Sequence, residues 1–133
     1  MIWQFFYSSL FSGPSEYVYD GKFDLFAYIV TMTVYSIFSP IQEIATRCAL
    51  QTTFFLFLPG GEITRKWNSI ILSNLIFSAV HSHMDLTFAI VAFVPGLFWG
   101  WLFHKQRSLV GVSVSHIVLG VWVLFIIGVE HIA

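Results

Sequence analysis

Five long stretches of the chain contain no Asp, Glu, Lys or Arg and consist mainly of Phe, Leu, Ile, Val and Trp. They cover residues 25–42, 48–61, 67–84, 86–104 and 108–129. A helix of about 20 apolar residues crosses the hydrocarbon core of a bilayer, which is about 30 Å thick. The charge-free stretches therefore predict an all-α fold, a polytopic transmembrane bundle of about four to five helices.

The composition agrees with a chain that has the lipid bilayer as a partner. Hydrophobic residues make up 57% of the chain and charged residues 10%, whereas a soluble domain carries roughly 25% charged residues. The net charge of −1 gives no reason to expect a nucleic-acid partner. Cys48 is the only cysteine, so an internal disulfide is excluded.

Prolines and glycines divide the chain into predicted helices. Pro40 is expected at the start of the second helix, where its missing N–H costs little, and Pro59-Gly60-Gly61 is expected to end that helix. Residues 1–22 are predicted to be an N-terminal interfacial or truncated segment, and residues 23–133 the membrane core. The predicted helices cover roughly residues 23–38, 39–57, 63–81, 85–104 and 108–128.

Basic residues gather near two predicted turns. Arg65 and Lys66 lie close to the turn after the second helix, and Lys105 and Arg107 lie in the turn after the fourth helix. Two membrane spans separate these turns, so we expect both on one side of the bilayer, the cytoplasmic side by the positive-inside rule.

Glu43 and Arg47 are ionisable residues in an otherwise apolar region. Such a group costs a few kcal/mol at bilayer depth, and therefore indicates a functional site that faces the protein interior. The two residues are four apart, so they can pair on one helix face. Arg47 is expected to form a structural ion pair that orients the carboxylate. Glu43 can be structural or catalytic.

Two histidines extend this set of candidates. His81 lies at a predicted helix end, where an interfacial histidine is common, whereas His116 lies within an apolar helix and needs a buried partner. If Glu43, His81 and His116 converge, a carboxylate and an imidazole can activate water while the second imidazole donates to an oxyanion. The same three residues can instead hold zinc, but they lack the spacing of a specific zinc motif.

Three short motifs carry a resemblance to a known family. They are Gln42-Glu43-Ile44-Ala45-Thr46-Arg47, Phe77-Ser78-Ala79-Val80-His81 and His116-Ile117-Val118-Leu119-Gly120. In their order and spacing they resemble the motifs of the CPBP family, the CAAX-processing and bacteriocin-processing intramembrane proteases, also called the Abi family. The resemblance extends over roughly residues 25–128.

The resemblance implies a hydrolase that cleaves a peptide or membrane-protein substrate. Glu43 and His81 would activate water and His116 would stabilise the oxyanion. The supporting residues would be Gln42, Arg47, Phe77 and Gly120. No metal or other cofactor would be required, although a bound metal stays an alternative. The resemblance also places the protein in a membrane, expected to be the bacterial inner (plasma) membrane, with a fused or partner regulatory domain or an oligomer as further expectations.

Two residues depart from the family motifs. Gln42 stands where the family has the glutamate that is assigned as the base, and an amide cannot accept a proton at neutral pH. Gly120 stands where the family has an asparagine that joins the last histidine as an oxyanion donor. Ser113, Ser115 and Asn74 are the replacement donors considered.

These departures leave three functions open. The first is an active intramembrane endopeptidase. The second is a catalytically silent relative that binds a peptide, a lipid or a partner membrane protein in the same place. The third, a structural subunit, is disfavoured because Glu43, Arg47, His81 and His116 are all present.

Overall fold

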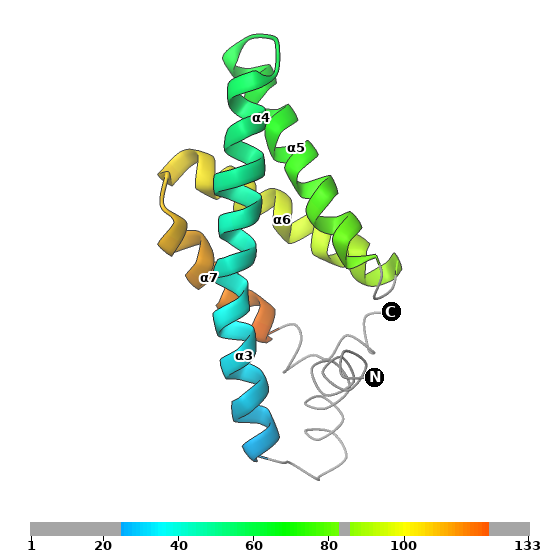
Figure 1. Cartoon of the computed structure of the whole chain (residues 1–133), viewed down its shortest axis with the longest axis vertical. Helices are drawn as coiled ribbons and strands as arrows, with labels where there is room; N and C mark the ends of the chain where they lie inside the picture. The colour runs from blue at the N-terminus through cyan, green and yellow to red at the C-terminus, as the bar shows by residue number, and fades with distance from the viewer. Residues whose placement is uncertain (1–24, 83–85, 123–133) are drawn as a thin grey trace. The chain divides into compact units, whose positions relative to one another are not determined.

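The computed structural model describes residues 25–82 and 86–122, and all of its regular elements in these residues are helices (Figure 1). The predicted all-α class is therefore confirmed for the described part of the chain. The segment predicted at residues 1–22 and the end of the fifth predicted helix, residues 123–128, lie outside the described residues. The elements are α3 (Leu25–Glu43), η1 (Ile44–Gln51), α4 (Thr52–Phe57), α5 (Glu62–His81), α6 (Leu86–Gln106) and α7 (Leu109–Val121).

The predicted boundary between the first two helices is wrong. Pro40 lies inside α3, and helical backbone continues through η1 and α4 to Phe57. Proline in a helix interior removes one backbone hydrogen bond and crowds the carbonyl of the residue four positions earlier, at a cost of about 3 kcal/mol that packing has to offset. The predicted end is confirmed: Leu58 is extended with ψ 139°, as favoured before a proline, and Gly60 has a φ of +113° that suits glycine.

The middle of this continuous helix is π-helical. The backbone N–H of Thr52 donates to the carbonyl of Arg47, five residues earlier, and Thr52 Oγ1 donates to the same oxygen at 2.9 Å. A π-turn admits one more residue than an α-turn and is found frequently at functional sites. The wide turn begins directly after Glu43 and contains Arg47.

The chain divides into two compact units. One contains residues 1–39 and 116–133, and the other contains residues 40–115. In the second unit α4 and α5 are neighbours along the chain and in space (Figure 1). Two hydrogen bonds join α5 to α6, from Asn74 Nδ2 to Phe93 O at 2.6 Å and from Ser78 Oγ to Ala89 O at 2.5 Å.

Two of the basic residues near the turns, Arg65 and Arg107, lie around one aromatic ring. Arg65 lies 5.1 Å from the centroid of the Phe55 ring, and Arg107 lies 5.7 Å from it. The His104 ring lies 5.3 Å from the same ring. These contacts are compatible with the expectation that the two turns share one side of the bilayer, and that expectation and its assignment as cytoplasmic both stay predictions.

Polar side chains dominate the described interior, and large apolar side chains dominate the surface. Phe26, Phe57 and Val110 are exposed by 78%, 82% and 74%, respectively. The buried polar residues are Ser39, Glu43, Thr46, Arg47, Gln51, Ser69, Ser73, Asn74, Ser113 and His116. This distribution is the one expected where lipid replaces water as the solvent. Among the described residues, α6 is the one helix long and apolar enough to cross a membrane.

Candidate active site

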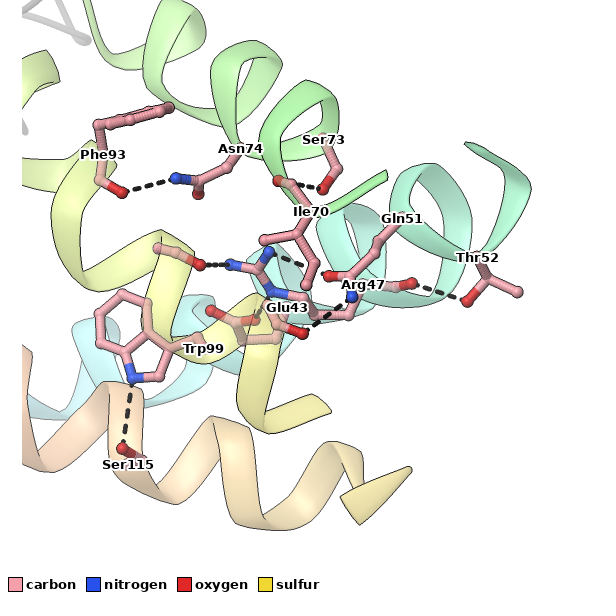
Figure 2. Close-up of polar contacts among 12 residues, drawn as sticks. Glu43, Arg47, Gln51, Thr52, Ile70, Ser73, Asn74, Phe93, Trp99 and Ser115 are labelled. Carbon is pink, nitrogen blue, oxygen red and sulfur yellow. Dashed lines mark hydrogen bonds and ion pairs between the residues drawn. The ribbon is translucent and has the colours of Figure 1, made fainter. Parts of the chain in front are cut away.

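Arg47 is the centre of a buried hydrogen-bond network (Figure 2). Its side chain is fully buried. Nε donates to Glu43 Oε2 at 2.8 Å, Nη1 to Gln51 Oε1 at 3.3 Å, and Nη2 to the carbonyl oxygen of Gly96 at 3.1 Å. The predicted pairing of Glu43 with Arg47 is confirmed. A charged group needs this degree of hydrogen bonding to stay in a low-dielectric interior.

Gln51 is a member of this network that the sequence analysis missed. It lies four residues after Arg47, at the end of η1, and Nε2 donates to the carbonyl oxygen of Gly100 at 2.9 Å. Arg47 and Gln51 thus bind two carbonyls that are themselves four residues apart on α6. The available signal was the repeat of Glu43, Arg47 and Gln51 at intervals of four in an apolar helix.

Positions 96 and 100 require glycine because side chains from other helices fill the space that a Cβ would occupy there. A Cβ on Gly96 would lie 2.7 Å from Asn74 Cγ. A Cβ on Gly100 would lie 2.8 Å from Ile70 Cγ2 and 3.1 Å from Arg47 Nη1. The absence of side chains on this face of α6 therefore lets the guanidinium reach the backbone.

The two residues at the start of the first motif differ in burial. Glu43 is fully buried, whereas Gln42 is half-buried. Neighbouring residues of a helix point about 100° apart, so one of them faces the interior more directly. The carboxylate of Glu43, not the amide of Gln42, is the group held by Arg47.

The proposed tautomer of His81 follows from its contact with Phe77. The Nδ1 atom lies 2.7 Å from the carbonyl oxygen of Phe77. A carbonyl only accepts, so Nδ1 carries the proton and Nε2 is the basic nitrogen of the neutral ring. The rings of the two residues also pack at 4.4 Å between centroids, and Phe88 contacts His81 at 5.9 Å. Phe77 thus holds the imidazole through both its backbone and its side chain.

His116 lies in the other compact unit with Tyr35 and Gly120. It is 5% exposed, and its ring meets the Tyr35 ring edge-on at 6.1 Å between centroids, with an interplanar angle of 74°. Glu43 and His81 belong to the unit of residues 40–115, so the convergence of these two residues with His116 stays a prediction. Within residues 25–82 and 86–122, no three His, Cys, Asp or Glu side chains form a group that could hold a metal ion.

The three replacement donors considered for Gly120 have different surroundings. Asn74 Nδ2 donates to Phe93 O, and Ser115 Oγ accepts from Trp99 Nε1 at 3.2 Å (Figure 2). Ser113 Oγ and Asn74 Oδ1 are buried and have no hydrogen-bond partner within the described part of the chain. The amide nitrogen of Asn74 therefore already donates its hydrogen bond to the backbone of α6.

The comparisons with known proteins place the chain in a family. No curated protein and no solved structure matches it significantly. The family model described as type II CAAX prenyl endopeptidase Rce1-like matches residues 24–122, a range that includes Gln42, Glu43, Arg47, Phe77, His81, His116 and Gly120. It agrees with the resemblance to the CPBP proteases, and its members are embedded in membranes. Since the match covers more than half of the sequence, the chain belongs to the Rce1-like family of type II CAAX prenyl endopeptidases.

Proposed function

We propose that the protein is an intramembrane endopeptidase that hydrolyses a peptide bond with an activated water molecule. The observation that carries the proposal is the fully buried Glu43 carboxylate, held in place by Arg47 at 2.8 Å inside an otherwise uncharged helix. Ionisable groups are expensive in such surroundings and are retained mainly where they have a function.

In the proposed reaction, water attacks the carbonyl carbon of the substrate. Glu43 and the Nε2 atom of His81 orient the water and take up its proton, and the same proton is then delivered to the leaving amine. His116 donates to the carbonyl oxygen as negative charge develops on it. Gln42 and Arg47 keep Glu43 in position, and Phe77 keeps His81 in position through the contact at 2.7 Å.

The proposed setting is a polytopic helix bundle in a membrane, with the bacterial inner membrane as the proposed location. The exposed apolar side chains and the buried polar ones support this setting. The family description suggests a C-terminal prenylated peptide as one substrate class, and a leader peptide or membrane-protein segment is the other. A regulatory domain and an oligomer are further proposals.

A catalytically silent binding protein is the second candidate. It is favoured by the amide at Gln42 and by the engagement of Glu43 Oε2 with a guanidinium. The Arg47 guanidinium already occupies one of the two carboxylate oxygens that would have to orient the water. In this case the same residues would bind a peptide, a lipid or a membrane partner without cleaving it.

Peptide cleavage by the purified protein in liposomes distinguishes the two candidates. Mass spectrometry of a transmembrane peptide library would detect new termini. We expect Glu43→Gln and His81→Ala each to lower the cleavage rate by about a hundredfold or more, because each removes a group that handles the proton. Cleavage by wild type that persists in His81→Ala would contradict the mechanism.

Matched controls use residues outside the network. Glu62→Gln changes an exposed glutamate at the start of α5, and His104→Ala changes a histidine near the end of α6. Both are expected to stay within about twofold of wild type. If wild type is inactive and Gln42→Glu cleaves, the protein is a silenced protease and the second candidate holds.

A further inference from the structure

The hydroxyl of Tyr35 occupies the space beside Gly120 in which a side chain would otherwise lie. A Cβ built on Gly120 would overlap with the Oη and Cζ atoms of Tyr35 and would lie 2.8 Å from its Cε1. Gly120 is buried. The absence of a side chain at position 120 is therefore what admits the phenol of Tyr35.

This phenol also lies next to His116. Residue 120 follows His116 by four positions on α7, so both positions share one face of that helix. The Tyr35 ring contacts the His116 ring edge-on, at 6.1 Å between centroids. All three residues belong to the same compact unit. The Tyr35 hydroxyl and the His116 imidazole, both of which can donate a hydrogen bond, belong to neighbouring side chains there.

The backbone around Tyr35 is also held in place. Ser39 Oγ donates to the carbonyl oxygen of Tyr35 at 2.8 Å, and Ser39 is fully buried. A tyrosine has only two side-chain torsions to fix, so little conformational entropy is lost when its hydroxyl is held in position. These are the properties required of a hydrogen-bond donor that has to be in place before a charge develops.

We propose that Tyr35 Oη is a second oxyanion donor, which acts with His116 on the carbonyl oxygen of the substrate. The inference rests on the proposed function and assigns that site a residue outside its three sequence motifs. Removing one donor from an oxyanion hole lowers kcat by about 10²–10³-fold. The competing explanation is that the Tyr35 ring only packs against His116.

Tyr35→Phe separates these explanations, because it keeps the ring and removes only the hydroxyl. We expect kcat for a fluorogenic peptide to fall by about a hundredfold while KM and the melting temperature change little. The matched control is Tyr28→Phe, on the same helix and also half-buried, which should cleave like wild type. Tyr35→Phe with wild-type kcat would overturn the proposal and leave the proposed function intact.

A rescue experiment covers the case in which a Tyr35 variant also loses stability. Tyr35→Ala clears the space beside Gly120, and adding Gly120→Asn then places an amide donor there. We expect the double variant to cleave at least about tenfold faster than Tyr35→Ala alone. No gain in the double variant, together with equal losses of kcat and melting temperature in Tyr35→Phe, would show that Tyr35 is structural.

A binding measurement distinguishes failure of this inference from failure of the proposed function. A peptidyl phosphonate carries a charged oxygen in tetrahedral geometry, so Tyr35→Phe should weaken its binding by about a hundredfold and leave binding of the matching peptide unchanged. If wild type neither cleaves the peptide nor binds the phosphonate, the proposed function fails and the donor role fails with it.

Discussion

Replacing Arg47 with leucine tests whether the buried ion pair holds the described core together. The change removes the donors to Glu43 Oε2, Gln51 Oε1 and the carbonyl of Gly96. It also takes the cation away from a carboxylate that is fully buried. Breaking a buried pair in this way costs about 3–5 kcal/mol, because the remaining charge keeps its desolvation penalty. We expect the free energy of unfolding to fall by about that amount.

The assay is reversible unfolding in mixed micelles, followed by circular dichroism as the denaturing detergent is increased. The double variant Glu43→Leu with Arg47→Leu removes both charges, so it should regain most of the loss. Lys105→Leu, which changes an exposed cation, should stay within about 0.5 kcal/mol of wild type. A cost below about 1 kcal/mol for Arg47→Leu would refute the reasoning, as would a double variant no more stable than the single one.

Two further substitutions probe the contact between η1 and α6 in the same unfolding assay. Gly96→Ala places a Cβ against Asn74 and should cost about 1–3 kcal/mol, whereas Gly61→Ala, with nothing within 4 Å of its Cβ, should cost far less. Gln51→Leu leaves its buried partners without the amide and should cost about 1–3 kcal/mol. Equal stability of Gly96→Ala and Gly61→Ala would show that the space beside α6 is not filled as described. A Gln51→Leu variant with the free energy of unfolding of wild type would show that the bond from Gln51 to Gly100 contributes nothing to stability.

Local features of the fold could be predicted from the sequence because their causes are local. The pairing of Glu43 with Arg47 follows from a spacing of four on a helix. The end of α4 follows from Pro59 and Gly60, which fix the backbone at those positions. For Arg65 and Arg107 the sequence suggested a shared side of the bilayer but not the aromatic ring of Phe55 that both of them approach.

The remaining features depend on packing that no short pattern encodes. Pro40 is tolerated inside α3, and the change to π-helix at Ile44 has no residue signature in this segment. The bond from Gln51 to the carbonyl of Gly100 joins residues 49 positions apart. The phenol of Tyr35 beside Gly120 was also missed, because it depends on packing between residues far apart in the sequence. The glycine at position 120 indicated the loss of the asparagine donor but not that Tyr35 fills its place.

The bond between Arg47 and Gly96 has a consequence for how the chain enters a membrane. The helix α6 is long and apolar enough to cross a membrane, whereas an arginine at the centre of a membrane helix costs about 2.5–3.5 kcal/mol. Glu43 and Gln51 are available to Arg47 as soon as the segment is helical, but the Gly96 carbonyl is synthesised 49 residues later. The set of three acceptors for Arg47 is therefore complete only after α6 has been synthesised and has packed against residues 44–51.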